Sequence, residues 1–576
     1  MARPVPRPLP TVAREFALAA DHFRAGRLDE AETVGTRVLK ALPDHFDVLH
    51  LLGVIKLKRG KAGAALGLLE AAVKTNPRSP DALTNLGLTL AALNRDSDAL
   101  ASFEQALALA PEHVDAQANR GSMLLKLHRP VEALASLDRV VAAAPGHVSA
   151  QINRGNALAL LERFDEALAQ YDALLAIHPE HPEAHFNRGR ALASLQRHAE
   201  AIAAYDQALS RRPDYARAHL SRGFSLQALN RFEEALASFA AVEALGPGQG
   251  QNDARHNAAL SRLTLGDYRR GFELYEARWL RSNMPQRRSF KKPLWLGEYP
   301  LHRKTILLHA EQGLGDTILF ARYAPLLARS GARVVLEVQP ELVSLLARLE
   351  GVAEAIARDD PLPAFDVHCP MGSLPLALHT ELASVPAEIP YIKASDARIA
   401  EWQTRLAALS APRVAVAWSG RASQANDRNR SIALERLAPL FALDRLSFIS
   451  IQHEPRAKDA EVLARIPGLT HVGDSLRDFE DTAAVLSLAD LVVSVDTSVA
   501  NLGGAMGRPT WIPLAFNADW RWLLERTDSP WYPTVRLYRQ PVPGDWDSVI
   551  ARVRDEMAIT LGEVPCTLPA SLQSVP

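Results

Sequence analysis

The segment ALASLQRHAEAIAAYDQALSRRP at residues 191–213 decides the fold of the first half of this chain. Its apolar residues recur at helical spacing on both sides of a polar turn at 196–198, and a proline follows the second helical stretch. Because proline cannot continue a helix, the segment predicts a helix, a turn, a second helix and a stop. The segment therefore indicates a helical hairpin.

The same pattern returns every 34 residues along the N-terminal half. A proline, a glycine and an alanine each keep this period, and they stand at Pro43, Pro77, Pro111, Pro145, Pro179, Pro213 and Pro247, at Gly53, Gly87, Gly121, Gly155, Gly189 and Gly223, and at Ala31, Ala65, Ala99, Ala133, Ala167, Ala201 and Ala235. A small residue is needed where two antiparallel helices cross closely, so the three landmarks predict a stack of hairpins. We count seven regular units, and an eighth, shifted by about two residues, is expected to cap the array.

These landmarks resemble the tetratricopeptide repeat over residues 12 to about 280. An amide residue stands two positions before the glycine in most units, at Asn85, Asn119, Asn153, Asn187 and, in the shifted unit, Asn257. Since an amide both donates and accepts, this ladder predicts a groove that holds the backbone of a protein client, and it resembles the ladder of O-GlcNAc transferases. The amides are equally explained by bonds to the neighbouring hairpin. The arginines one position later are expected to be solvated or paired with acids: Arg120, Arg154, Arg188 and Arg222.

The composition excludes several classes of protein. The chain has 576 residues, of which 48% are hydrophobic and 23% charged, so it is expected to form several packed domains. The net charge of -1 supplies no field for a polyanion, so no nucleic acid partner is expected. The sequence has no uninterrupted run of about 18 apolar residues, so no membrane span is expected. Cys369 and Cys566 lack metal-binding spacing and the N-terminus lacks a secretory signal, which together favour a cytoplasmic location.

Strand-like and helix-like segments alternate in the second half. Strands are expected at 304–310, 332–338, 365–368, 413–418, 447–452, 469–474, 490–496 and 509–514. This alternation predicts two parallel sheets of unequal size in two lobes with a cleft. The expected organisation is a flexible tail (1–11), the repeat superhelix (12–283), a connector (284–303), a first lobe (304–390), an inter-lobe bridge (391–412), a second lobe (413–560) and a tail (561–576).

Two strand ends carry residues suited to chemistry. The first is QGLGD at 312–316, where glycines permit a tight turn and close approach of a ligand before a helix begins. The second is SVDTSVAN at 494–501, where free N–H groups and hydroxyls at a helix start suit a diphosphate. Asp316 and Asp496 are also explained as simple helix caps.

Several further blocks carry a resemblance to a known family. With GLGD (313–316) and VDTSVANLGGAMGRP (495–509), the stretches VAWSG (416–420), NDRNRS (426–431), NADWRW (517–522) and DSPWYP (528–533) resemble glycosyltransferase family 9, the ADP-heptose transferases, and more closely the bacterial proteins that join such a module to tetratricopeptide repeats. The resemblance covers about residues 300–560. It implies a GT-B fold of two Rossmann-like lobes and an inverting transfer from a nucleotide-sugar donor, without a metal or another cofactor.

The resemblance also implies roles for individual residues. Asp316 matches the general base on the acceptor side, which takes the proton of the attacking hydroxyl. Arg430, with Arg428 as a second candidate, falls near the basic residue that meets the charge of the leaving diphosphate. Asn501 stands where the family more often has His, and an amide cannot carry charge. The remaining donor-binding candidates are Gly313, Gly315, Asp496, Thr497 and Ser498.

Other polar and aromatic residues are given no catalytic role. The two D-x-D spacings, Asp96 with Asp98 and Asp545 with Asp547, do not follow strands and are expected to be solvated. His309 and His368 are expected to be core histidines. For the dense C-terminal aromatics, packing is favoured over stacking on a nucleobase: Trp511, Trp520, Trp522, Trp531, Tyr532, Tyr538 and Trp546.

Three functions fit these patterns. The leading hypothesis is a glycosyltransferase that modifies a hydroxyl of a protein client recruited by the repeats, since a protein acceptor benefits from a high local concentration. The second is a heptosyltransferase-like enzyme of envelope polysaccharide synthesis, and the third is a scaffold with an inactive transferase module. Under the first hypothesis, deletion of residues 1–280 is expected to abolish client modification and to leave donor hydrolysis measurable.

Overall fold

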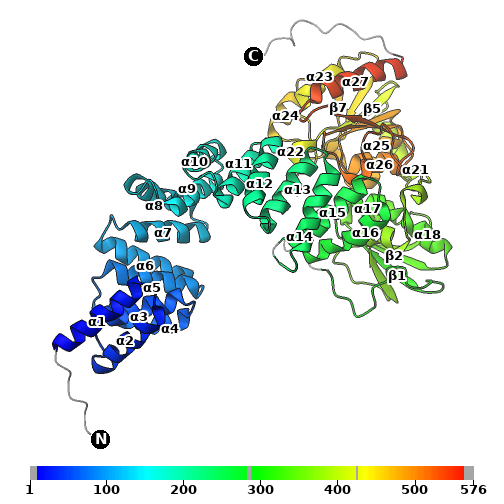
Figure 1. Cartoon of the computed structure of the whole chain (residues 1–576). Coiled ribbons are helices and arrows are strands. Elements are labelled where there is room, and N and C mark those ends of the chain that lie inside the picture. Colours follow the sequence, from blue (N-terminus) through cyan, green and yellow to red (C-terminus); the bar gives the residue numbers. More distant parts are fainter. Residues whose placement is uncertain (1–8, 249, 282–286, 423–425, 563–576) are drawn as a thin grey trace. The chain divides into compact units, whose positions relative to one another are not determined.

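The computed structural model describes residues 9–248, 250–281, 287–422 and 426–562 (Figure 1). Most of both predicted tails lies outside these ranges. The chain divides into two compact units, Met1–Ser225 (unit 1) and Leu226–Pro576 (unit 2). No helix in the described part of the chain is long and apolar enough to cross a membrane.

Unit 1 consists of antiparallel helix pairs that follow one another along the chain, as the 34-residue period predicts. Its helices are α1 (Leu9–Arg24), α2 (Leu28–Ala41), α3 (Phe46–Lys58), α4 (Ala62–Thr75), α5 (Pro80–Ala92), α6 (Asp96–Leu109), α7 (Val114–Lys126), α8 (Pro130–Ala143), α9 (Val148–Leu160), α10 (Phe164–Ile177), α11 (Pro182–Ser194), α12 (His198–Arg211) and the start of α13 (Ala216–Ala228). The hairpin interpretation of the first half is confirmed.

Close helix crossings explain the repeated glycine. A Cβ added to Gly155 would lie 2.5 Å from the ring of Tyr171, and a Cβ added to Gly189 would lie equally close to the ring of Tyr205. Heavy atoms do not approach so closely, so any larger residue would push the two helices of the hairpin apart. The glycine is therefore a packing requirement of each hairpin.

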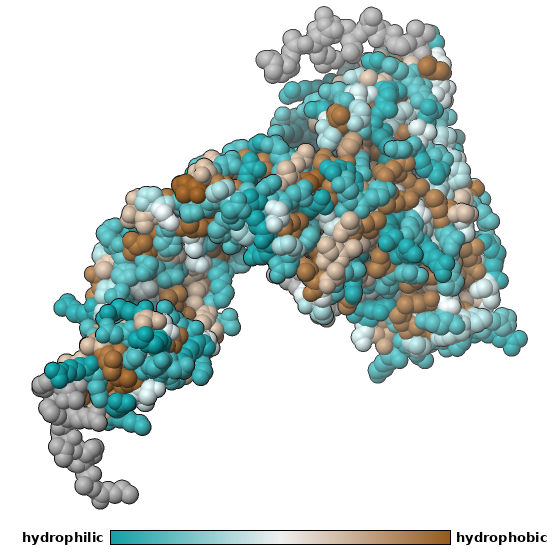
Figure 2. Space-filling model, viewed as in Figure 1, coloured by the Kyte–Doolittle hydropathy of each residue, from teal (hydrophilic) through white to brown (hydrophobic). Residues whose placement is uncertain are grey.

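The repeated arginines pair with acids, one of the two outcomes that the sequence allows. Arg154 Nε lies 2.7 Å from Asp138 Oδ1, and Arg188 Nε lies 2.5 Å from Asp172 Oδ1. Arg120 pairs with Glu104 and Arg222 with Asp206 in the same way. Figure 2 shows hydrophilic side chains interspersed with smaller apolar areas over the repeat helices. These partly exposed pairs each contribute little to stability.

Unit 2 begins with further helices and continues into parallel sheets. The helices are the end of α13, α14 (Phe232–Ala244), α15 (Gln251–Thr264), α16 (Tyr268–Tyr275) and the 3-10 turn η1 (Glu276–Leu280). The strands are β1 (Thr305–His309), β2 (Arg333–Val338), β3 (Val352–Ala357), β4 (Val367–Pro370), β5 (Arg413–Ala417), β6 (Ser447–Ser450), β7 (Leu469–His471), β8 (Leu491–Ser494), β9 (Thr510–Leu514) and β10 (Val535–Arg539).

The strands form two parallel sheets of unequal size, as predicted. One has four strands in the order β3-β2-β1-β4, and the other has six in the order β10-β9-β8-β5-β6-β7. The sequence missed β3 and β10. Both are edge strands, and VAEAIA (352–357) and VRLYR (535–539) each carry a charge within the strand, which interrupts the apolar signal.

Helices connect and cover these strands, as expected for an α/β region. They are α17 (Leu314–Ala321), α18 (Tyr323–Arg329), α19 (Val343–Leu346), α20 (Leu374–Ala377), α21 (Asp396–Arg405), α22 (Asp427–Arg430), α23 (Ala438–Phe441), α24 (Ala457–Leu463), α25 (Phe479–Ser487), α26 (Ser498–Ala505) and α27 (Trp546–Thr560), with the 3-10 turns η2 (Pro340–Leu342), η3 (Met371–Ser373), η4 (Leu382–Ser384), η5 (Leu434–Leu437), η6 (Gly473–Ser475) and η7 (Trp520–Trp522).

The last hairpin, α15–α16, packs into the core of the α/β region. The indole N–H of Trp531 donates to Tyr268 Oη over 3.0 Å, and the two rings stack with their centroids 5.7 Å apart. Phe272 meets Trp520 edge-on at 5.6 Å. The eighth unit, expected as a cap of the array, therefore shares one hydrophobic core with the sheets.

Candidate active site

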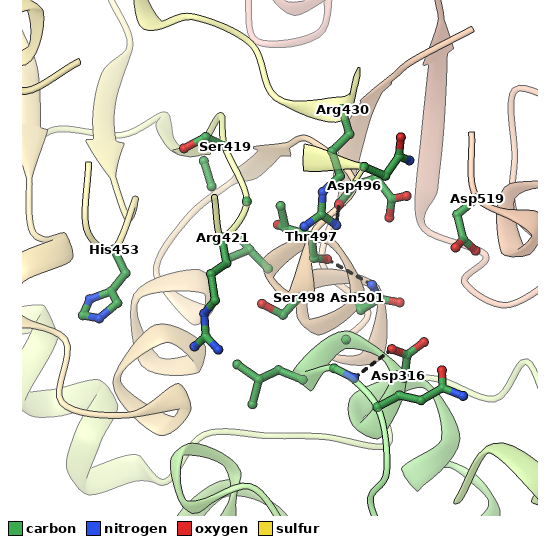
Figure 3. Close-up of a pocket in the computed structure, with 18 of the residues that line it drawn as sticks. Asp316, Ser419, Arg421, Arg430, His453, Asp496, Thr497, Ser498, Asn501 and Asp519 are labelled. Carbon is green, nitrogen blue, oxygen red and sulfur yellow. Dashed lines mark hydrogen bonds between the residues drawn. The ribbon is translucent and has the colours of Figure 1, made fainter. Parts of the chain in front are cut away.

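The two strand ends singled out by the sequence line one cleft of about 1020 Å³ in unit 2 (Figure 3). Their helices begin against each other: a Cβ added to Gly315 at the start of α17 would lie 3.0 Å from Asn501 Nδ2 on α26. Glycine at this position permits that approach. The sequence-predicted residues that line the cleft are Gly313, Gly315, Asp316, Arg430, Asp496, Thr497, Ser498 and Asn501.

Asp316 both holds its own turn and faces the cleft. It is the third residue of α17, and its Oδ2 accepts a hydrogen bond from the backbone N–H of Gly313 over 3.1 Å. Its Oδ1 accepts one from Arg521 Nη2 over 2.5 Å, and 24% of the side chain is exposed. Gly313, and not Asp316, is thus the N-cap residue of α17; the carboxylate supports the helix start from within the helix and also lines the cleft.

Arg521 and Asp519 are two cleft residues to which the sequence gave no role. The guanidinium of Arg521 is buried between Asp316 and Asp519, whose Oδ1 lies 2.7 Å from Arg521 Nη1. Burial raises the pKa of Asp519 to about 6, and the neighbouring Asp496 adds to this, although Arg521 acts in the opposite direction. Both residues lie in the NADWRW block (517–522), which is the sequence feature that could have pointed to them.

Arg430 lies over the start of α26. Its Nη1 donates to the backbone oxygen of Asp496 over 2.7 Å, and its Nε lies 3.7 Å from the buried carboxylate of Asp427. A Cβ added to Gly420 would lie 2.4 Å from Arg430 Nη2, which explains the glycine of VAWSG. The structure separates the two arginine candidates, since Arg428 is exposed and does not line the cleft.

The start of α26 presents backbone N–H groups to the cleft. Thr497, not Asp496, is the N-cap residue, and its hydroxyl lies 3.0 Å from Ser494 Oγ. The first N–H groups of a helix lack partners within the helix and attract anions. Thr497 and Ser498 thus lie where a phosphate group would meet these N–H groups.

Asn501 is engaged within the protein. Its Nδ2 donates to the backbone oxygen of Thr497 over 3.0 Å, and its Oδ1 accepts from the hydroxyl of Tyr532 over 3.1 Å. The side chain is only 2% exposed. These bonds give the amide a structural task at the point where α17 and α26 meet.

Arg421 is a further cationic residue of the cleft that the sequence analysis did not assign. Figure 3 shows its side chain extending toward the space beside Ser498, with His453 on the other side. Arg421 is exposed and directly follows the VAWSG block, which was its only signal. Arg421 and Arg430 together bring two guanidinium groups to the side of the cleft formed by the larger sheet.

The asparagine ladder is bonded within the protein at two positions, and only one of these bonds reaches the neighbouring hairpin. Asn85 Nδ2 lies 2.9 Å from His50 Nε2 of the preceding hairpin, and Asn257 donates to Asp253 O of its own helix. Asn187 is 5% exposed, whereas Asn119 and Asn153 are half-buried. Bonding to the protein itself is therefore seen at Asn85 and Asn257, and client binding stays a prediction for the ladder.

Several other candidates lie in the core or on the surface. His309 Nε2 and His368 Nδ1 are 3.2 Å apart, and burial lowers the pKa of His309 to about 3, so it stays neutral. The seven C-terminal aromatics are all buried, and of these Trp520 also lines the cleft. Within the described ranges no group of three or more His, Cys, Asp or Glu side chains is arranged to hold a metal ion.

Comparisons with known proteins define the class of the first half. The tetratricopeptide repeat model matches residues 16–80, 50–111, 97–148, 152–216 and 197–250. The predicted repeats are thus confirmed within residues 16–250, and an α/β region follows them along the chain.

Among curated proteins, Protein FlbA of Caulobacter vibrioides is 26% identical over 318 residues. The match covers 50% of this chain, which spans about half (52%) of that relative's length. Solved structures that resemble the chain include a tetratricopeptide repeat protein from Parabacteroides merdae (20% identity, 43% of this chain and 98% of that one, TM-score 0.36) and PilW, a type IV pilus biogenesis factor (23% identity, 36% and 97%, TM-score 0.34).

Proposed function

We propose that this protein is an inverting glycosyltransferase that moves a sugar from a nucleotide-sugar donor to a hydroxyl of a protein client. The observation that carries this proposal is the shared cleft, in which a carboxylate at the start of one helix faces the N-terminus of another helix and two arginines. The two parallel sheets on either side of the cleft are compatible with a GT-B fold.

The proposed reaction needs one base and one site for the leaving group. The acceptor hydroxyl attacks the anomeric carbon, its proton passes to the carboxylate of Asp316, and the bond from that carbon to the diphosphate oxygen breaks. The nucleoside diphosphate leaves with the electron pair of that bond, and its added charge is met by Arg430, Arg421 and the N–H groups of α26.

Asp316 is held so that proton transfer has a defined geometry. Gly313 fixes one carboxylate oxygen and Arg521 the other, which orients the group in the absence of substrate. A substrate hydroxyl that approaches Asp316 must therefore share or displace the bond with Arg521.

Titration of the full chain with UDP, GDP, ADP and CDP tests the proposal, together with turnover of the corresponding sugar nucleotides. We expect at least one nucleotide to bind. Asp316→Asn should bind it with unchanged affinity and lose about two to four orders of magnitude in turnover, the usual contribution of a positioned base.

Two results would reject the proposal. A chain that binds none of these nucleotides would be a scaffold, the third hypothesis from the sequence. Near-normal turnover by Asp316→Asn would remove this carboxylate from the reaction. A donor limited to ADP-linked sugars, with no transfer to protein, would instead favour the heptosyltransferase-like alternative.

A further inference from the structure

The last helical hairpin forms part of the wall of the cleft. His256 and Leu260 on α15, Tyr275 at the end of α16 and Arg278 in η1 line the same cleft as Asp316. All four belong to unit 2. The repeat pattern assigns this hairpin only to the array, so the contact with the cleft is a property of the fold.

Hydrogen bonds connect this hairpin to the turn that carries Asp316. Tyr275 Oη donates to Gln312 Oε1 over 3.1 Å, and Gln312 Nε2 lies 2.8 Å from the same hydroxyl. Arg278 Nη2 donates to Glu311 Oε1 over 3.0 Å. Since Glu311 and Gln312 directly precede Gly313, the hairpin wall adjoins the base rather than the arginines of the larger sheet.

Aromatic packing connects the same hairpin to the segment that carries Arg521, the second hydrogen-bond partner of Asp316. The helix α15 packs against η7, and Phe272 on α16 meets Trp520 of η7 edge-on. Trp520 lines the cleft and directly precedes Arg521, which holds Asp316. The hairpin therefore contacts both elements that position the proposed base.

The wall offers apolar and uncharged polar groups. His256 is 8% exposed and stacks on Tyr275 with ring centroids 5.6 Å apart; burial, assisted by Arg281 and Arg278, lowers its pKa to about 4, so the imidazole is neutral. Its Nδ1 is buried and has no hydrogen-bond partner among the described residues. Leu260 adds an aliphatic surface.

The guanidinium of the wall is already neutralised. Arg278 is fully buried, and its Nη1 donates to Glu276 Oε1 over 2.6 Å while Nη2 is shared by Glu311 and Ser373. An acceptor rich in phosphate or carboxylate groups favours unpaired cations. Arg278 is the cation that lines the cleft among the described residues from His256 to Arg278, and it is paired with Glu311.

We propose that the surface formed by His256, Leu260 and Tyr275 is an acceptor subsite, which holds an uncharged segment of polypeptide beside the hydroxyl that receives the sugar. This inference rests on the proposed function and names its acceptor. A neutral imidazole pairs with a peptide group of the client, and Leu260 packs against the client's apolar side chains. The subsite gives the hairpin a direct part in the choice of acceptor.

Full-length His256→Phe and Leu260→Gln test the subsite. The first variant keeps a ring against Tyr275 and removes both ring nitrogens, and the second replaces an aliphatic surface by an amide. The probes are synthetic peptides with one serine flanked by uncharged residues, a matched set flanked by acidic residues, and a phosphorylated oligosaccharide. Two rates are measured, peptide glycosylation and hydrolysis of the sugar nucleotide without peptide.

We expect both variants to raise the KM for uncharged peptides about tenfold, the effect of one lost hydrogen bond or contact, and to leave hydrolysis unchanged. Unchanged hydrolysis also shows that the variants fold. Leu265→Gln is the matched control, because Leu265 lies on the same hairpin, is 36% exposed and does not line the cleft. Both rates should be normal in this control.

Each other outcome overturns the subsite. Normal peptide kinetics in both variants would reject the subsite. Measurable hydrolysis of the sugar nucleotide would still support the proposed enzymatic function. Hydrolysis without transfer to any uncharged peptide, or transfer only to acidic peptides or to the oligosaccharide, would reject an uncharged polypeptide as the occupant. A wild-type chain that turns over no sugar nucleotide would reject the proposed function, and the subsite would fall with it.

Discussion

Tyr171 and Tyr275 hold the corresponding position of their hairpins, yet their hydroxyls serve different ends. The hydroxyl of Tyr171 donates to Asn156 Oδ1 over 2.8 Å, within its own hairpin. The hydroxyl of Tyr275 instead bonds to Gln312, next to the turn of Asp316. The same repeat position thus stabilises the array in one hairpin and supports the proposed active site in the other.

The two hairpins also differ in their ion pairs. Arg154 in the array is 29% exposed and pairs with Asp138 on the surface, whereas Arg278 is fully buried between Glu276 and Glu311. A buried pair that loses one partner leaves an uncompensated charge, and an exposed pair does not. The helical repeat pattern therefore extends beyond unit 1, and its last hairpin belongs to the hydrophobic core of the α/β region.

Truncation should produce the largest difference. Removal of residues 1–225 should leave a folded unit 2 that binds nucleotide and hydrolyses donor, because the cleft and its hairpin wall are retained. Removal of residues 1–280 also takes away Tyr268, Phe272 and Tyr275, whose burial contributes roughly 5 kcal/mol or more. We expect this shorter chain to be unfolded, as judged by thermal unfolding and nucleotide titration.

This result would revise the expectation drawn from the sequence, in which a cut at 280 left donor hydrolysis measurable. Equal stability and hydrolysis in the two truncated chains would instead mean that the last hairpin is only part of the array. If the chain that lacks only residues 1–225 failed to fold, unit 2 would need the preceding repeats for its stability.

The second largest difference should come from the ion pairs. Arg278→Gln should lower the free energy of unfolding by about 3 to 5 kcal/mol, since Glu311 is left buried without its partner. The matched control, Arg154→Gln, should cost less than about 1 kcal/mol. Denaturant unfolding of the full chain measures both values, and similar losses in the two variants would contradict the distinction.

How far the sequence predicts this molecule depends on the distance along the chain between interacting residues. The 34-residue period predicts the hairpins, and β-branched runs predict the central strands, because both signals are local. The edge strands β3 and β10 lack that signal. The strand ends at Asp316 and Thr497 are found from their glycines and hydroxyls, which mark each turn by itself.

The support of the site could not be predicted in this way. Arg521 meets Asp316 across 205 positions of the chain, and Tyr275 meets Gln312 across 37. Nothing in the NADWRW block or in the last repeat indicates these partners. His256 and Leu260 likewise follow the repeat pattern, and only the packing of α15 against η7 brings them to the cleft.

The paired tyrosines give a third and smaller difference. Tyr275→Phe should lower donor turnover about tenfold, because Gln312 loses a partner and the turn of Asp316 is held less precisely. Tyr171→Phe should leave turnover unchanged. This variant loses one hydrogen bond and Tyr275→Phe loses two, each worth about 1 kcal/mol of stability. Steady-state rates measured beside unfolding curves separate the two effects. Equal turnover in both variants would show that the Tyr275 hydroxyl has only a structural task.

The smallest difference concerns pH. Because burial lowers the pKa of His256 to about 4 from an unfolded value near 6.5, the unfolded state binds the proton more readily. The stability associated with neutral His256 is therefore present above pH 6.5 and is lost as the pH falls from there toward 4. Between pH 7 and pH 5.5, wild type should lose about 1 kcal/mol more than His256→Phe. Parallel stability curves of the two proteins over this range would show that His256 is not held neutral by the wall of the cleft.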